Sequence, residues 1–193
     1  MSAFSSKEPC PVRKALKERL NEAFGPFQDE DDADRFLAEH PELADFNDVY
    51  GKKSKAIAQD FGEARKQLEE LGFSREQARE ISIRMGEART SAAKDFQKYY
   101  KGRPDAENHP NWHCGDCETA SNKLVDEMGD FEARPHSGRS GGHHWVSMPN
   151  PKGGEDVFLD LTASQYKSGF IFKSPERRMV FFQAQHEKFL AGI

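Results

Sequence analysis

Cysteine is scarce in this chain of 193 residues, which has only Cys10, Cys114 and Cys117. A small, odd number of cysteines argues against a fold stapled by disulfides. The chain also lacks an apolar run long enough to span a bilayer, and its first residues lack the basic start and apolar stretch of a secretory signal. We therefore expect a cytoplasmic protein without a membrane partner.

Excess positive charge is also missing, since the net charge is −5 and the isoelectric point is about 5.8. No basic patch interleaved with aromatic residues is present, so we expect no nucleic-acid partner. The acidic run Asp29–Asp34 lacks the glycine and the terminal glutamate of a calcium-binding EF-hand loop. Neither sustained heptads nor internal repeats occur, which excludes a long coiled coil and a repeat architecture.

Helical patterns fill the first half of the chain. Apolar residues recur at every fourth position from Val12 to Phe24, and the acidic run Asp29–Asp34 is typical of a helix N-terminus. A long helix is predicted from about Ser54 to Leu71. Ser74–Gln77 then has the pattern of a capping box, which opens another helix that ends near Tyr100.

The composition predicts two regions, a helical N-terminal region over residues 1–104 and a mixed α/β core over residues 105–193. Because roughly ninety residues is small for an independent core, we expect the helices to pack on it. The chain has 15 phenylalanines, so its interior should be built largely from phenylalanine. A terminal helix is predicted over residues 175–190, with three apolar side chains buried: Met179, Phe182 and Phe189.

A β-hairpin is predicted in the second half. Residues 143–148 follow a Gly-Gly pair and end at a proline, and residues 156–162 form a second apolar run after a turn rich in proline and glycine. Side chains alternate along a strand, so His143 and Trp145 share one face, whereas His144 points to the other. Only one of the two histidines can therefore face a given site.

Cys117 is predicted to lie at the start of a helix. Ala120, Leu124 and Met128 follow it at helical spacing on the same face, and Gly129 is a natural C-terminal stop. A helix N-terminus favours the thiolate over the thiol, and the thiolate is the nucleophilic form of cysteine. Cys117 is therefore a candidate nucleophile.

An imidazole and a carboxylate follow this thiol in the order that an activated cysteine requires. His143 is the candidate base, and Asp160 lies inside an apolar run where a carboxylate is costly to bury without a partner. Orienting the histidine would satisfy that carboxylate. The three residues together predict a Cys-His-Asp catalytic site.

Three segments carry a family resemblance: Gly-Asp-Cys-Glu-Thr-Ala at residues 115–120, His-His-Trp at 143–145, and Asp-Leu-Thr-Ala-Ser-Gln-Tyr at 160–166. In this order they resemble the papain-like and transglutaminase-like cysteine hydrolase superfamily. The closest likeness is to a set of small bacterial proteins with Gly-x-Cys-x-x-Thr-Ala, His-x-Trp and Asp-Leu-Thr-x-x-Gln-aromatic patterns.

The resemblance implies an α+β fold with a papain-like core, in which a helix packs on a small antiparallel sheet. It implies Cys117 as nucleophile, His143 as base and Asp160 as the residue that orients the base. A hydrolase or acyl-transfer enzyme of this kind, whether protease, deamidase or amidase, needs no cofactor or metal and acts on a protein or peptide substrate. A helical extension on such a core also fits a bacterial effector or toxin that is delivered into another cell, with the N-terminal helices binding a protein partner.

Residues near the expected nucleophile complete the predicted site. Papain-like enzymes often place a glutamine upstream of the cysteine as a donor to the oxyanion, and Asn111 is the nearest candidate here. Asn111 or Trp112 should line the site because the chain passes the nucleophile just before the helix. Trp145 shares the face of His143 and should shelter the thiolate–imidazolium pair from water.

Other functions use the same residues. Cys114 and Cys117 form a Cys-x-x-Cys pair, and two histidines follow, so a tetrahedral zinc site is one alternative. His143 and His144 are adjacent on a predicted strand, however, which makes it difficult for both to reach one ion. A redox function would need a thioredoxin-like β-α-β context, which the pattern lacks. A catalytically inactive interaction module is the remaining alternative.

Overall fold

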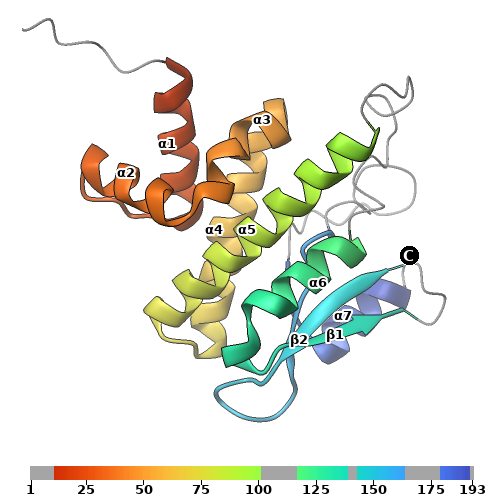
Figure 1. Cartoon of the computed structure of the whole chain (residues 1–193). Helices are drawn as coiled ribbons and strands as arrows, with labels where there is room; N and C mark the ends of the chain where they lie inside the picture. Colours follow the sequence, from red (N-terminus) through yellow and green to blue (C-terminus); the bar gives the residue numbers. More distant parts are fainter. Residues whose placement is uncertain (1–10, 101–116, 139–142, 164–178, 192–193) are drawn as a thin grey trace, which may run out of the picture.

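Helices dominate the first half of the chain. The computed structural model describes residues 11–100, 117–138, 143–163 and 179–191 (Figure 1). The elements of the first described range are α1 (Pro11–Phe24), α2 (Glu30–Glu39), the 3₁₀ turn η1 (Pro41–Asp45), α3 (Phe46–Tyr50), the 3₁₀ turn η2 (Gly51–Lys53), α4 (Ser54–Leu71) and α5 (Arg75–Tyr100).

Side-chain caps fix where two of these helices begin. At α5 the Ser74 backbone N–H donates to Gln77 Oε1 at 3.0 Å, and the Gln77 backbone N–H donates to Ser74 Oγ at 3.1 Å. This reciprocal pair confirms the predicted capping box. At α2 the Asp29 side chain accepts a hydrogen bond from the Asp32 backbone N–H at 2.8 Å, which confirms the acidic run as a helix start.

A small antiparallel sheet forms in the second half. The elements are α6 (Cys117–Glu127), the 3₁₀ turn η3 (Gly129–Phe131), β1 (Arg134–Ser137), β2 (His144–Met148), β3 (Val157–Leu159), β4 (Val180–Phe182) and α7 (Gln183–Ala191). The strands lie in the order β1-β2-β3-β4, and each neighbouring pair is antiparallel. The fold is therefore α+β, with a helix packed on a small sheet, as the sequence predicts.

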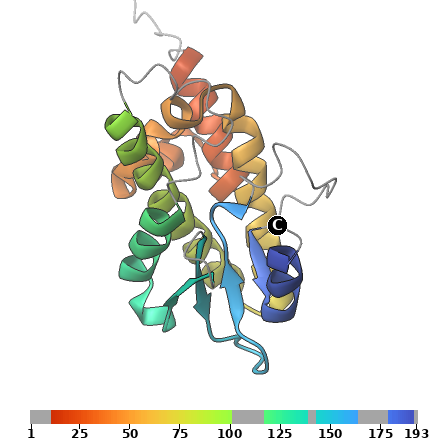
Figure 2. The same ribbon diagram turned by 90° about the vertical axis from the view of Figure 1, so that its right-hand side faces the viewer.

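Helices cover both faces of this sheet (Figure 2). Val146 and Leu159 point toward α6 and are fully buried in the main core, together with Leu124 of that helix. Trp145 and Phe158 point to the opposite face, where α7 packs on β3 and β4. The alternation predicted for the hairpin thus separates a layer shared with α6 from a layer shared with α7.

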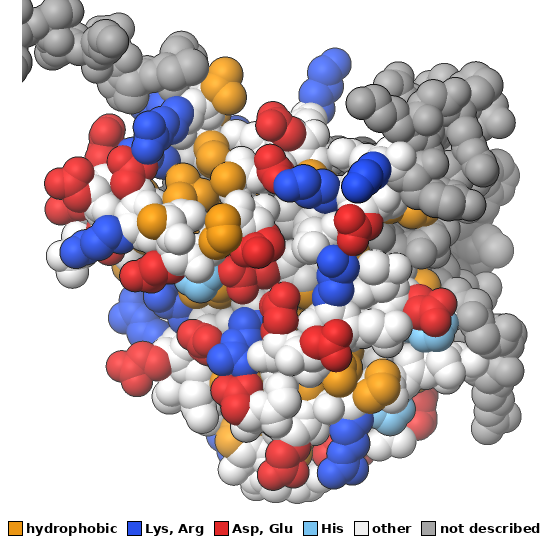
Figure 3. Space-filling model, in the orientation of Figure 1, with side chains coloured by type: hydrophobic (Ala, Val, Ile, Leu, Met, Phe, Trp, Pro, Cys, Tyr) orange, Lys and Arg blue, Asp and Glu red, His pale blue; other side chains and the backbone are white. Residues whose placement is uncertain are grey.

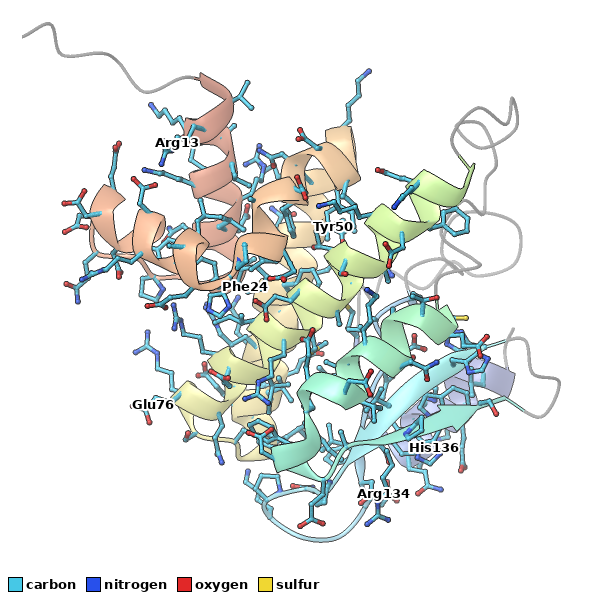
Figure 4. The ribbon with its side chains drawn as sticks, in the orientation of Figure 1. Arg13, Phe24, Tyr50, Glu76, Arg134 and His136 are labelled. Carbon is cyan, nitrogen blue, oxygen red and sulfur yellow. The ribbon has the colours of Figure 1, made fainter. Side chains whose placement is uncertain are left out.

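One apolar core joins the helical region to the sheet, because its members run from Leu20 of α1 to Val180 of β4. The prediction of an interior built largely from phenylalanine is wrong, because alanine and leucine are both more numerous than phenylalanine in this core. The rings of Phe24, Phe46 and Phe61 are fully buried, and the Phe24 and Phe61 ring centroids lie 5.6 Å apart. Figure 4 shows Phe24 among the packed helices of this region.

The C-terminal segment differs from its prediction. The expected helix over residues 175–190 is wrong in its first part, because Val180–Phe182 forms strand β4 and the helix begins only at Gln183. The β-branched and aromatic side chains of this short run suit a strand, and β3 offers a backbone edge for it to pair with. Met179 is buried as predicted, Phe182 is only half-buried, and the Phe189 side chain lies outside the described side chains.

The surface mixes charges of both signs. Figure 3 shows basic and acidic side chains interspersed over the face drawn there. Among the described helices, none has the length and apolar character that crossing a membrane would require.

Candidate active site

Cys117 is the first residue of α6, and its side chain is buried. Ala120 and Leu124 follow it in the helix, Met128 comes directly after the helix ends, and all three are fully buried in the main core. Their packing therefore fixes the end of the helix that carries the sulfur. The backbone N–H groups of a first helical turn have no partner within the helix, so the partial positive charge of this end lies beside the thiol.

His143 lies immediately before β2 and is also buried. Its Nε2 is 2.6 Å from Oδ2 of Asp160, and the Cys117 thiol lies close enough to raise the pKa of the ring. Because Asp160 occupies Nε2, Nδ1 is the ring nitrogen left to face the sulfur. One imidazole thus joins the thiol to the carboxylate.

Asp160 follows the last residue of β3 and has no exposed surface. Its backbone N–H donates to the Met179 carbonyl at 2.8 Å, which ties it to the chain entering β4. Its Oδ1 accepts the Thr162 backbone N–H at 3.1 Å. Burial opposes the charged form, but the hydrogen bonds and positive charge of the facing histidines hold the pKa of Asp160 below its usual value.

The surroundings of His143 favour its protonated form. Burial lowers the pKa of the imidazole, but the hydrogen bonds and negative charges of Asp160 and Cys117 outweigh it and raise the pKa to about 9. At neutral pH His143 is therefore an imidazolium that can pair with a thiolate.

A second histidine lies at this site, and the sequence analysis did not identify it. His186, in α7, is fully buried, and its Nε2 is 2.9 Å from the same Oδ2 of Asp160. Its ring packs against the rings of Trp145, Phe158 and Phe181, with centroid separations of 4.7, 5.5 and 5.1 Å. A histidine inside a helix that follows an aromatic run was the only signal in the sequence, and such a residue is more often a satisfied core histidine than a site residue.

The remaining predicted site residues have different outcomes. Trp145 is buried beside His143, with ring centroids 5.8 Å apart, which places it as predicted. His144 begins β2, is half-buried and belongs to the opposite face. Asn111 and Trp112 lie outside the described residues, as does Cys114.

Metal binding is the other function that the two histidines and the carboxylate could serve. His143, Asp160 and His186 offer three ligand atoms within 4.8 Å of one another, the only such group among the described residues. Ligands at about 2.0–2.1 Å from a tetrahedral zinc lie about 3.3 Å from one another. The two nitrogens lie 2.6 and 2.9 Å from one shared oxygen, which is hydrogen-bonding geometry. The donor set therefore fits a hydrogen-bonded cluster better than a zinc site.

Comparison of the chain with protein-family models, with curated proteins and with solved structures found no match.

Proposed function

We propose that this protein is a cysteine-dependent hydrolase or acyl-transfer enzyme that uses Cys117, His143 and Asp160. One observation supports the proposal: the buried imidazole of His143 is hydrogen-bonded to the buried Asp160 carboxylate, and the Cys117 thiol at the N-terminus of α6 is close enough to raise the pKa of the same ring. These are the parts that activate a cysteine nucleophile. The three side chains come from the start of α6, the residue before β2 and the residue after β3, and the imidazole donates to the carboxylate.

The geometry supports a two-stage reaction on an amide or thioester carbonyl. The Cys117 thiolate attacks the carbonyl carbon, forming a C–S bond and moving the π electrons onto oxygen. The oxyanion collapses, the leaving amine or thiol departs, and His143 donates its Nδ1 proton to it. The product is a thioester on Cys117 beside a neutral imidazole.

The second stage regenerates the site. His143 Nδ1 takes a proton from water or an acceptor amine as that molecule attacks the thioester. The C–S bond then breaks and the electron pair returns to sulfur, which restores the thiolate–imidazolium pair. Asp160 holds the ring so that Nδ1 stays directed at the sulfur in both stages, and it stabilises the imidazolium.

The backbone of α6 is suited to stabilise the oxyanion. Cys117 is the first residue of this helix, so the free backbone N–H groups of the first turn belong to Cys117 and the residues that directly follow it. A donor of this kind typically stabilises a transition state by about 2.7–4 kcal/mol. Asn111 is proposed as a side-chain donor to the same oxygen, and Trp112 as a neighbouring wall of the site.

A protein or peptide is the proposed substrate class. Peptide hydrolysis, glutamine deamidation and transamidation share the thioester intermediate, and they differ only in the leaving group and in the acceptor. A bacterial effector acting on a protein of another cell fits this chemistry, with the N-terminal helices as the proposed surface for a partner.

Alkylation of the whole protein with iodoacetamide at neutral pH, followed by mapping of the modified residues, tests the proposal. Cys117 should react fastest because its thiolate is paired with an imidazolium, and Cys114 and Cys10 serve as internal controls. Faster labelling of Cys114 would contradict the assignment of the nucleophile.

Two neighbouring histidines supply a matched pair of variants. His143→Gln should abolish the rapid reaction at neutral pH, whereas His144→Gln should leave most of it because that side chain belongs to the opposite face of β2. Equal effects of the two variants would overturn the role of His143. Stoichiometric zinc in the purified protein, lost in His143→Gln, would favour the metal-site alternative instead.

A further inference from the structure

Two histidines from different elements share one carboxylate oxygen. His143 Nε2 lies 2.6 Å from Asp160 Oδ2, and His186 Nε2 lies 2.9 Å from that same atom. An ionised carboxylate only accepts hydrogen bonds, so both nitrogens carry a hydrogen. His186 thereby contacts the carboxylate that orients His143, although it lies 26 residues further along the chain.

Packing around position 186 requires a side chain of this size, but it does not require a polar one. Three aromatic rings, those of Trp145, Phe158 and Phe181, surround it, and its side chain is fully buried. A polar ring in such surroundings costs free energy unless it is hydrogen-bonded, and a phenylalanine would avoid that cost. The contact with Asp160 gives this polar side chain a function.

We infer that His186 is a positioning residue of the proposed Cys-His-Asp site, which it completes by holding the Asp160 carboxylate and sharing its negative charge. The inference rests on the proposed function, because it assigns His186 a role in that same site. The Thr162 backbone N–H fixes Oδ1, and the two imidazoles fix Oδ2, so the carboxylate cannot rotate away from His143. An ordinary triad has only one imidazole on this oxygen.

Sharing the oxygen has a consequence for His143. Each hydrogen bond that Oδ2 accepts spreads its negative charge, so the bond from His186 weakens the attraction of Asp160 for the imidazolium of His143. Two other titratable groups lie near the pair: Cys117 of α6 beside His143, and His136 of β1, whose ring stacks on Trp145. His136 forms its side-chain hydrogen bond with Ser147 Oγ, at 2.7 Å, so the loss of His186 should by itself strengthen the attraction of Asp160 for His143.

The experiment compares the full-length wild type with His186→Phe, His186→Gln and His136→Phe. The phenylalanine at 186 keeps the ring volume but removes the donor, the glutamine restores an N–H donor, and His136→Phe changes another histidine that stacks on Trp145. The readouts are the midpoint of the His143 ring resonances in an NMR pH titration, and kcat and KM for hydrolysis of p-nitrophenyl acetate.

We expect His186→Phe to move the His143 midpoint above its wild-type value and to lower kcat about tenfold, the scale of losing an outer hydrogen-bond partner, with KM unchanged. His186→Gln should return both quantities toward the wild type, and His136→Phe should leave both unchanged. Equal midpoints in His186→Phe and His136→Phe would overturn the inference. So would a kcat loss in His186→Phe that glutamine does not rescue.

Failure of the proposed function gives a different result. Wild-type protein whose Cys117 is no more reactive than Cys114 would contradict the cysteine hydrolase, whereas the NMR midpoint would still measure the coupling of His186 to His143. If His186→Phe does not fold, as judged by circular dichroism, His186→Met supplies the same comparison with a flexible apolar side chain.

Discussion

Asp160 is the residue on which the proposed site depends most, because it has no exposed surface and accepts hydrogen bonds from three neighbours: His143, His186 and Thr162. An asparagine there could place its one oxygen toward the two imidazoles. Its NH₂ group would then face the Thr162 backbone N–H, which is also a donor. Asp160→Asn therefore keeps the shape of the side chain, but it removes the negative charge and the hydrogen bond from the Thr162 backbone N–H.

We predict that Asp160→Asn remains folded but loses about 3 kcal/mol of unfolding free energy, the scale of removing one partner from a buried ion pair. Its Cys117 should also be alkylated more slowly at neutral pH, because His143 loses the negative charge that stabilises its imidazolium. Urea unfolding and iodoacetamide kinetics measure the two effects. Asp126→Asn, a change at an exposed position of α6, is the control and should alter neither.

The pKa of His143 predicts a pH dependence of stability. Folding raises this pKa from 6.5 to about 9, so the folded state binds the proton more tightly than the unfolded chain. The contribution to stability is fully present below pH 6.5, declines above it, and is lost as the pH rises through about 9.

Urea midpoints measured from about pH 6 to about pH 10 should therefore fall in the wild type more steeply than in His143→Gln, which lacks the titrating group. His144→Gln should retain the wild-type slope. Parallel curves for the wild type and His143→Gln would show that His143 binds its proton equally well in both states.

At the scale of elements, two helices of the N-terminal region approach each other closely. Gly86 of α5 lies against the ring of Phe24 in α1, where an added Cβ would come within 2.5 Å of the ring carbon Cζ. Phe24 itself is fully buried between the rings of Phe36 and Phe61, so it has little room to retreat. A side chain at position 86 would push the two helices apart.

We predict that Gly86→Ala destabilises the protein by about 1–3 kcal/mol through overpacking, although alanine favours a helix over glycine by about 1 kcal/mol. In the Phe24→Leu background the same change should cost less, because the smaller side chain leaves room for the methyl group. Denaturation of the four proteins in this double-mutant cycle measures the coupling. An equal cost of Gly86→Ala in both backgrounds would show that Phe24 does not cause it.

At the scale of the whole molecule, a single apolar core links the N-terminal helices to the sheet that carries the site. The sheet has only four short strands, and α6 packs on β1 and β2 while α4 packs on β4. The helical region therefore supports the sheet through packing.

Such a shared core predicts one unfolding transition. In a Trp112→Phe background, Trp145 is the only tryptophan and reports on the sheet, while far-ultraviolet circular dichroism reports mainly on the helices. The two signals should change at the same urea concentration. In the same background Phe61→Ala, a change in the helical part, should reduce the free energy of unfolding by about 3–5 kcal/mol. The urea midpoints of the two signals should therefore fall together. Separate transitions would mean that the two regions fold independently.

Features that depend on residues close together in the chain could be predicted from the amino-acid sequence. Helix spacing and the capping box at Ser74 predicted α4 and α5 because such signals act within one or two turns. The apolar register after Cys117 predicted α6 and the residue at its start. Side-chain alternation along the strand predicted that His143 and His144 belong to opposite faces of the hairpin.

Only the tertiary structure decided the features that depend on distant residues. Strand β4 was missed because three residues become a strand only when an edge such as that of β3 is available. The contact of His186 with Asp160 joins α7 to the end of β3, and no spacing along the chain encodes such a meeting. The burial of that carboxylate, and the raised pKa of the histidine beside it, likewise follow from packing of elements that are far apart in the sequence.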